Sequence, residues 1–276
     1  MYQQELAVAR RAAHEAAAII RRYASNRKEL SIELKGRHDL VTEADVETEK
    51  KIRKVIATHF PDDDFFGEES HKNEKISSGR TWIVDPIDGT TNFAHGFPIF
   101  CVSIALMEAG ELRVGVVLEV NSAQLFYAVQ GQGAYLNEEE IFVSQNTEPS
   151  QLLLGTGFPY RDLDLLDDYM KLFQVFMRET HGVRRPGSAC YDLCCMAAGW
   201  LDGFFEYALS PWDVAAGALI IKEAGGTVTD WEGGEKWLHG RRIICGNKDV
   251  HSYLLKRIRE NVSEENRAAT GPAYVS

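Results

Sequence analysis

One short segment constrains this chain more than any other: an apolar run that ends directly in an acidic turn. Residues 81–84 (Thr-Trp-Ile-Val) have the aromatic and β-branched side chains typical of a buried strand. Asp85 and Pro86 follow at once, and because proline lacks a backbone donor we expect it to end the strand. Asp88 and Gly89 then provide turn chemistry, so two carboxylates can face one point. The segment predicts either a polar turn or, because carboxylate oxygens are hard ligands, a Mg²⁺ site.

Other acids lie beside apolar segments, and each also has an ordinary structural explanation. Glu68 and Glu69 follow a strand-like stretch, where two adjacent glutamates are usually solvated. Asp213 opens a strongly apolar helical segment and could be its N-cap. Asp45 lies behind Thr42 and could likewise be only a capping acid. The residues alone leave the structural and the metal-binding interpretation open.

The spacing of apolar residues indicates two parts of the chain with different orders of helices and strands. Amphipathic helices are expected over 3–26 and 45–60, and strand patterns follow at 64–66, 100–107, 113–120 and 124–129, the last three as an antiparallel meander. Beyond about residue 150, strands at 152–155, 203–207 and near Val228 and Ile243 alternate with helices over 163–179, 188–198, 214–224 and 250–261. This order predicts an α+β half over 1–150, an α/β half over 151–262 and a loose tail over 263–276, joined in one integrated unit.

Composition and charge exclude several classes of protein. Hydrophobic residues make up 45 % of the 276 residues, which is enough for a sizeable core. The net charge of −11 argues against nonspecific nucleic-acid binding, but an anionic substrate stays possible because divalent cations can bridge acidic ligands to phosphate. No apolar run approaches the roughly 20 residues that span a membrane, and the N-terminus is charged throughout. We therefore expect a cytoplasmic protein without a signal peptide.

Cysteine and histidine patterns speak against disulfide and zinc chemistry. The five cysteines are odd in number and irregular in spacing, and Cys190, Cys194 and Cys195 are expected to pack in a helical core. The eight histidines form no i, i+4 pair, which disfavours zinc. No serine nucleophile elbow or phosphate-binding Walker loop is found in the sequence.

A covalent aspartyl-phosphate mechanism can also be tested on the sequence. Haloacid-dehalogenase phosphatases carry the motif Asp-x-Asp-Gly-Thr, and Asp88-Gly89-Thr90 matches its second half. The nucleophile would have to occupy position 86, which is Pro86. That mechanism therefore lacks its nucleophile in this chain.

Taken together, the acidic segments resemble the signatures of the inositol monophosphatase family, a Mg²⁺-dependent, lithium-sensitive phosphatase superfamily. Three blocks carry the resemblance: Glu68-Glu69-Ser70, Asp85-Pro86-Ile87-Asp88-Gly89-Thr90-Thr91-Asn92-Phe93 and Trp212-Asp213-Val214-Ala215-Ala216-Gly217. Three more occur in the family's order and spacing: Asp39-Leu40-Val41-Thr42-x-x-Asp45, Arg185-Pro186-Gly187-Ser188-Ala189 and Glu223-Ala224-Gly225-Gly226. Several fixed matches in one order leave little room for coincidence.

The resemblance implies a cluster of two to three Mg²⁺ ions. Glu68, Asp85 and the carbonyl of Ile87 would hold the first ion. Asp85, Asp88 and Asp213 would hold the second, and Glu68 with waters would help to hold a third. Because these acids lie far apart in the chain, the site is expected where the two halves meet.

The resemblance also implies catalytic and substrate-binding roles. Thr90 and Asp45 would orient and deprotonate an attacking water, and Glu69 would contact water at the metal ions. Asp88 with the backbone amides of Gly89 and Thr90 would lie at the phosphate. The remaining expected substrate contacts are Gly187, Ser188, Ala189, Glu206 and, on a mobile loop over 35–38, Lys35.

The family's fold is a five-layer αβαβα sandwich, usually a homodimer, and its members are inhibited by Li⁺. The resemblance favours a phosphate monoester of inositol or a similar polyol or sugar. Arg184 and Arg185 could touch a second phosphate, which keeps open fructose 1,6-bisphosphate, NADP(H) or 3′-phosphoadenosine 5′-phosphate as substrates. We expect neither a membrane nor a direct nucleic-acid partner. An interaction protein of the transcription machinery is the alternative of a different class, because some bacterial relatives have that role.

Overall fold

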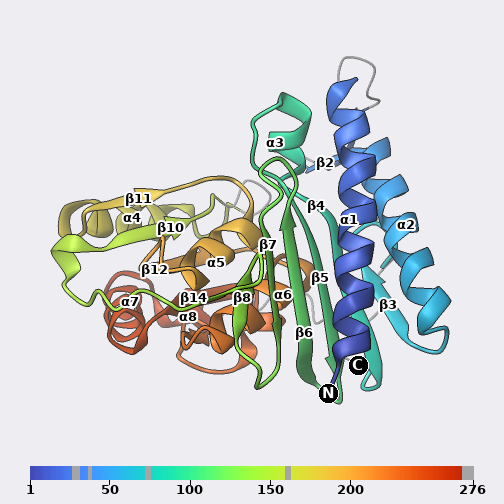
Figure 1. Cartoon of the computed structure of the whole chain (residues 1–276). Helices are drawn as coiled ribbons and strands as arrows, with labels where there is room; N and C mark the ends of the chain where they lie inside the picture. Colours follow the sequence, from blue (N-terminus) through green and yellow to red (C-terminus); the bar gives the residue numbers. More distant parts are fainter. Residues whose placement is uncertain (27–31, 37–38, 72–75, 159–162, 269–276) are drawn as a thin grey trace.

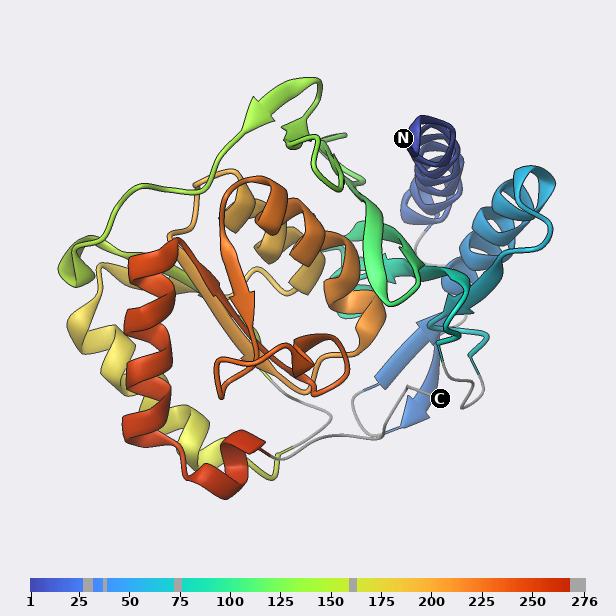
Figure 2. The same cartoon turned by 90° about the horizontal axis from the view of Figure 1, so that it is seen from below.

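Two large β-sheets and three layers of helices make up the core of the fold (Figure 1). The computed structural model describes residues 1–26, 32–36, 39–71, 76–158 and 163–268, without the side chains of 32–36 and 39–41. Helices α1 (Gln3–Ser25) and α2 (Glu43–His59) cover one face of the first sheet. Helices α5 (Ala189–Ala197) and α6 (Pro211–Glu223) lie between the two sheets, as the view from below shows (Figure 2). Helices α4 (Leu166–Glu179) and α7 (Lys248–Asn261) cover the outer face of the second sheet, which confirms the αβαβα sandwich.

The first sheet has seven strands in sequence order: β3 (Asp64–Gly67), β4 (Arg80–Asp88), β5 (Cys101–Glu108), β6 (Glu111–Glu119), β7 (Leu125–Val129), β8 (Ala134–Leu136) and β9 (Glu139–Ile141). All neighbours are antiparallel except β3 and β4, which run parallel. The predicted meander over residues 100–129 is confirmed. The short strands β8 and β9 escaped prediction, because three residues are too few to show a period of two.

The prediction that Pro86 ends its strand is wrong. Strand β4 continues to Asp88, and its pairing with β5 shifts register between Asp85 and Asp88. Pro86 lies within this bulge, where the strand does not need its missing donor. The backbone N–H of Ile87 donates to Asp85 Oδ1 at 3.0 Å inside the same bulge. The irregularity therefore re-aims two acidic side chains at the end of the strand.

The second sheet is mixed, with the strand order β11-β10-β12-β14-β13. Its strands are β10 (Leu153–Thr156), β11 (Gly182–Arg184), β12 (Gly203–Tyr207), β13 (Thr227–Thr229) and β14 (Arg242–Gly246). Strand β10 is parallel to both of its neighbours, whereas β14 is antiparallel to β12 and β13. The expected helices begin at Leu166, Ala189, Pro211 and Lys248, within a few residues of the predicted starts.

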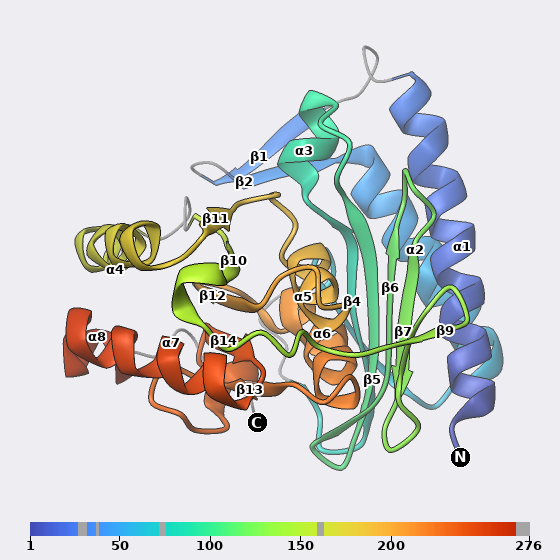
Figure 3. The same cartoon turned by 60° about the vertical axis from the view of Figure 1, so that its left-hand side comes forward.

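Smaller elements complete the chain. The hairpin β1 (Ile32–Gly36) and β2 (Asp39–Thr42) lies beside the short helix α3 (Thr90–His95), which follows β4 (Figure 3). Two 3₁₀ turns occur at Pro149–Gln151 and Lys236–Leu238. The expectation of a loose tail over 263–276 is wrong for its first part, because α8 (Glu264–Ala268) is helical; residues 269–276 lie outside the described residues.

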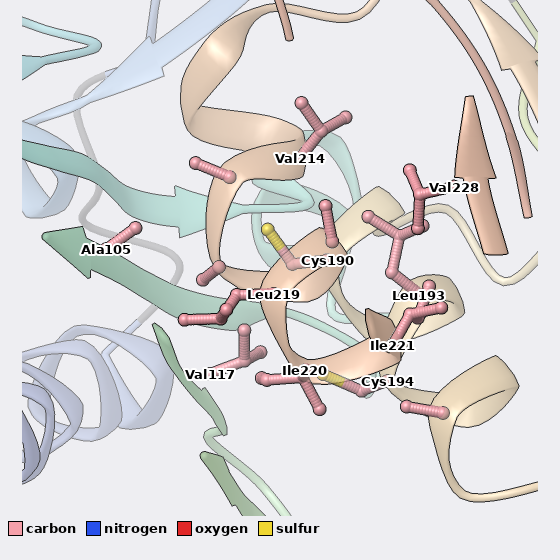
Figure 4. Close-up of a cluster of buried hydrophobic side chains, with 14 of the residues drawn as sticks. Ala105, Val117, Cys190, Leu193, Cys194, Val214, Leu219, Ile220, Ile221 and Val228 are labelled. Atoms are coloured by element: carbon pink, nitrogen blue, oxygen red, sulfur yellow. The ribbon is translucent and has the colours of Figure 1, made fainter. Parts of the chain in front are cut away.

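The central core joins the two halves. Helix α6 is apolar on nearly all sides because it packs on both sheets, and α5 lies against it. Cys190 and Cys194 are fully buried among Leu193, Ile220 and other apolar side chains of this core (Figure 4). The prediction of cysteines packed in a helical core is thus confirmed. In the described part of the chain, no helix combines the length and apolarity that a bilayer crossing needs.

Candidate metal centre

Three carboxylates from distant parts of the chain converge at one point. Asp85 and Asp88 come from the bulge of β4, and Asp213 comes from the first turn of α6. One carboxylate oxygen from each lies within 4.8 Å of the others. Glu68, in the turn after β3, lines the same pocket and acts electrostatically on Asp85. The described residues thus bring together the four acids that the sequence singled out as metal ligands.

Helix N-termini position Asp213 and Asp45. Asp213 is the third residue of α6, and its Oδ2 accepts a hydrogen bond from the backbone N–H of Ser210 at 2.7 Å. It is therefore the acid of a capping box, with Ser210 as the N-cap, and not the N-cap itself. Asp45 has the same place in α2, where its Oδ2 accepts from the backbone N–H and the hydroxyl of Thr42 at 2.9 and 2.6 Å. Asp45 and Asp213 are therefore capping acids, and Asp213 also belongs to the three convergent carboxylates.

Thr90 links Asp45 to the end of β4. Its hydroxyl donates to Asp45 Oδ1 at 3.2 Å and to the carbonyl of Ile87 at 3.0 Å. Asp45 is buried, with 1 % of its surface exposed. The two residues expected to handle water are thus in contact, 45 positions apart in the sequence.

The cluster concentrates negative charge in a buried place. Burial raises the pKa of Asp85 well above its usual range, and the neighbouring carboxylates of Glu68, Asp88 and Asp213 raise it further. Burial also raises the pKa of Asp88, opposed by the Ser188 hydroxyl, which donates to its Oδ2 at 2.7 Å. Such a cluster is costly unless a cation neutralises it.

The donor set fits a hard divalent cation. Every side-chain donor is a carboxylate oxygen, and Ile87 lines the same pocket. Oxygen donors without thiolate or imidazole suit Mg²⁺ and disfavour zinc. A divalent cation would also reverse the electrostatic cost of burying the acids. The residues present therefore fit the expected Mg²⁺ cluster.

The loop that follows β11 packs against α3 beside the pocket. Asn92 Nδ2 donates to the carbonyls of Ile99 and Pro186, both at 2.9 Å. Gly187 has a φ of +94°, and a Cβ there would lie 2.9 Å from Asn92 Nδ2. Gly89 has a φ of +95° and faces the same loop, because its Cβ would lie 3.3 Å from the carbonyl of Gly187. The two glycines permit the close approach that joins the halves of the chain here.

Most of the expected substrate-binding residues line this pocket. They are Asp88, Gly89, Thr90, Gly187, Ser188, Ala189 and Glu206. Two expected residues are placed differently. Glu69 is not among the described residues that line the pocket, and its backbone N–H donates to Glu49 Oε2 at 2.8 Å. Lys35 belongs to β1 and not to a loop; its side chain and residues 37–38 lie outside what the structure describes.

The structure adds pocket residues that sequence reasoning missed. Asp192, Gly157 and Phe158 line the pocket beside Glu206. The one signal for Asp192 was a lone acid within the otherwise apolar helix α5. An acid in such a helix is costly unless it has a partner or a function.

Comparisons with known proteins agree with the geometry. The sequence profile described as "Inositol monophosphatase family" matches residues 1–264. The Nus factor SuhB of Pseudomonas aeruginosa is 40 % identical over 264 residues, which cover 94 % of this chain and 97 % of that protein. The inositol-1-monophosphatase of Rhizobium meliloti is 40 % identical over 233 residues, covering 84 % and 88 %.

The fold agrees as well. The crystal structure of extragenic suppressor protein suhB from Bartonella henselae superposes with a TM-score of 0.90 at 37 % identity, covering 94 % of this chain and 100 % of that one. A profile match over nearly the whole length and relatives at this level of identity leave no ambiguity at the family level. With its acid cluster in place at the junction of two sheets, the chain belongs to the inositol monophosphatase family.

Proposed function

We propose that this protein is a Mg²⁺-dependent phosphate monoester hydrolase that acts on inositol monophosphate or a similar polyol or sugar phosphate. The convergence of Asp85, Asp88 and Asp213 within 4.8 Å carries the proposal. Hydrolysis of phosphate monoesters is among the slowest uncatalysed reactions, so it demands strong charge stabilisation. The relatives named inositol-1-monophosphatase support the substrate class.

Glu68, Asp85, Asp88 and Asp213, with the carbonyl of Ile87, would hold two to three Mg²⁺ ions. When bound, the ions would supply charge stabilisation to the attacking and leaving oxygens of an in-line displacement. The backbone N–H groups of Gly89 and Thr90 would donate to the phosphate.

Thr90 and Asp45 would prepare the attacking water. The Thr90 hydroxyl donates its proton toward Asp45 and toward the carbonyl of Ile87, so its lone pairs are left to accept from a water. That contact would orient the water, and Asp45 would take up its proton through the Thr90 hydroxyl. Direct attack by water needs no side-chain nucleophile, in agreement with the sequence motifs. Glu69 and Lys35 stay predictions of the family resemblance.

A phosphate-release panel tests the proposal. The substrates are inositol 1-phosphate, fructose 1,6-bisphosphate, NADP and 3′-phosphoadenosine 5′-phosphate at one fixed Mg²⁺ concentration. We expect the highest kcat/KM on inositol 1-phosphate and no turnover with excess EDTA. A higher kcat/KM on one of the other three substrates would show that the protein is a phosphatase of that substrate instead. Release of phosphate from none of them would refute the proposal.

A second candidate function rests on the names of the relatives. Proteins named Nus factor SuhB are about as similar to this chain as those named inositol-1-monophosphatase. We therefore also propose an interaction with the transcription machinery, which is the alternative of a different class that the sequence analysis names. Co-purification of the tagged protein with RNA polymerase tests it, and its absence at near-physiological salt would contradict it. The Asp85→Asn variant should co-purify equally well if the two functions are separate.

Three further properties are proposed from the family alone. These are a cytoplasmic location, a homodimer and inhibition by Li⁺. Light scattering of the purified protein and a Li⁺ titration of phosphate release check the last two.

A further inference from the structure

Two side chains from outside the acid cluster hold the turn that carries Glu68. Residues 68–70 form this turn after β3, and we call them the ligand turn. Glu49 of α2 and His71, which directly follows the turn, each contact its backbone. Neither is among the described residues that line the pocket. They can therefore act on the metal centre by placing a ligand, not by being one.

Glu49 holds the ligand turn from the side of α2. Its Oε2 accepts a hydrogen bond from the backbone N–H of Glu69 at 2.8 Å. Glu49 is buried, with 4 % of its surface exposed, so water competes little for this contact. Gly67 leaves room for the carboxylate, because a Cβ at position 67 would overlap Glu49 Oε2. Since Glu49 lies one helical turn after Asp45, α2 places both the Asp45 carboxylate and the ligand turn.

His71 holds the same peptide group from the other side. Its ring Nδ1 lies 2.9 Å from the carbonyl oxygen of Glu68. Because a carbonyl oxygen can only accept, Nδ1 carries the proton in this contact and the ring donates. The peptide between Glu68 and Glu69 is thus held at both of its polar groups, the carbonyl by His71 and the N–H by Glu49. Both contacts leave the Glu68 carboxylate itself to the pocket, which it lines.

The His71 ring also joins the ligand turn to the second half of the chain. Its centroid lies 4.7 Å from that of Trp212 and 5.6 Å from that of Phe66. Trp212 directly precedes Asp213 at the start of α6. His71 therefore contacts both the segment that carries Glu68 and the segment that carries Asp213. Its position bears on how the acids of the two halves lie relative to one another.

We propose that Glu49 and His71 are positioning residues that set the affinity of the site for Mg²⁺ by orienting the Glu68 carboxylate. This inference rests on the proposed metal-dependent function and adds two residues to which the family resemblance gave no role. Two hydrogen bonds to one peptide group leave the ligand turn little freedom, so little conformational entropy is lost when its carboxylate binds a cation. Loss of either hydrogen bond should therefore weaken the binding of Mg²⁺. The alternative is that both residues only pack the fold, and it predicts a metal affinity that does not depend on these hydrogen bonds.

Two variants of His71 separate hydrogen bonding from packing. His71→Phe keeps a ring against Trp212 but has no donor for the Glu68 carbonyl, whereas His71→Asn loses the ring and can place its amide nitrogen where Nδ1 lies. The Kd of the tightest Mg²⁺ site is measured by isothermal titration calorimetry on EDTA-treated, dialysed protein without substrate. We expect His71→Phe to raise this Kd about tenfold or more, as the loss of a group that orients a metal ligand typically does. His71→Asn should stay closer to the wild type.

Two variants of Glu49 repeat the comparison at the other end of the peptide. Glu49→Met has a similar length without an oxygen acceptor, whereas Glu49→Gln keeps one acceptor oxygen for the Glu69 N–H. Both remove the charge, so a larger rise in Kd for Glu49→Met than for Glu49→Gln reports the hydrogen bond alone. In all four variants kcat at saturating Mg²⁺ should change much less than Kd, because the lost contacts act on binding of the ion.

A control and the two positions together make the result decisive. His14→Phe makes the same change on an exposed site of α1 and should leave the Kd unchanged. If one of the two positions does not tolerate substitution, the other keeps the test valid. A wild-type Kd in both His71→Phe and Glu49→Met would overturn the inference while the metal-dependent function stands. Weaker binding in His71→Asn than in His71→Phe would also overturn it, because packing would then be the cause.

Failure of the proposed function gives a different result. A wild-type protein that binds no Mg²⁺ would overturn the metal-dependent function and this inference with it. The expected order of Kd values without phosphate release from any substrate of the panel would overturn the hydrolase function alone.

Discussion

Asp85 lies at the centre of the acid cluster. It is buried, it lies in the β4 bulge beside Asp88, and three further acids act on it. Its proximity to the other carboxylates is stable only when the charge is neutralised, by protons or by a divalent cation. A cation bound at this one side chain would therefore couple the stability of the fold to metal binding.

Replacing Asp85 should separate stability from activity. Asp85→Asn removes a buried charge while keeping the shape, so in EDTA we expect an equal or higher Tm than in the wild type. Mg²⁺-dependent phosphate release should fall about a thousandfold or more, as expected when charge stabilisation of the transition state is lost. Circular dichroism and a phosphate-release assay measure the two effects. The exposed Asp62→Asn is the matched control, and near-wild-type turnover of Asp85→Asn would refute its role as a ligand.

The raised pKa values of Asp85 and Asp88 predict how stability depends on pH. Because the folded-state pKa lies above the unfolded one, the folded protein binds more protons in the interval between them. In EDTA, this contribution to the free energy of unfolding is therefore lost as the pH rises from about 4 through the raised values. Mg²⁺ binds the ionised form, so its stabilising effect should be larger at pH 8 than at pH 5. Thermal denaturation with and without Mg²⁺ checks this, and equal Mg²⁺ effects at both values would contradict it.

At the level of elements, the sequence predicted the regular parts better than the irregular ones. The meander, the central helices and the strand at 203–207 have patterns long enough for hydrophobic periodicity to identify them. The bulge in β4, the six-residue α3 and the hairpin β1–β2 depend on register and tertiary contacts, which no local pattern encodes. The acids of the candidate metal centre were identified because they belong to motifs. Asp192 was not identified, because it belongs to no motif and reaches the pocket only through the packing of α5.

The loop that follows β11 is expected to be intolerant of a side chain at Gly187. Gly187→Ala places a Cβ 2.9 Å from Asn92 Nδ2 at a φ of +94°, so both strain and a clash result. Gly131 has a φ of +74° with nothing within 4 Å, so Gly131→Ala has the strain without the clash. We expect Gly187→Ala to lose about 1–2 kcal/mol more stability than Gly131→Ala, and to lose activity as well. Denaturant unfolding measures the difference, and equal losses would show that the loop does not need close contact.

On the scale of the whole molecule, the site depends on both halves being folded together. The central core combines side chains of both sheets with those of α5 and α6. The pocket takes Asp85 and Asp88 from the first half and Asp213 and Glu206 from the second. Neither half can form the acid cluster alone.

Unfolding of the metal-free protein is therefore expected to be one cooperative transition. A shared core makes the folding of each half depend on the other. Differential scanning calorimetry should give a single peak whose calorimetric and van't Hoff enthalpies agree. Two resolved transitions would mean that the halves fold as separate domains.

The most direct test of the account is to locate a divalent cation in crystals grown with Mn²⁺, which takes oxygen ligands as Mg²⁺ does and has a usable anomalous signal. The account predicts an anomalous peak at roughly 2.2 Å from carboxylate oxygens of Asp85 and at least two of Glu68, Asp88 and Asp213, lost in Asp85→Asn. If crystals with saturating Mn²⁺ show no anomalous peak among these four acids, or show one only elsewhere, the account is contradicted.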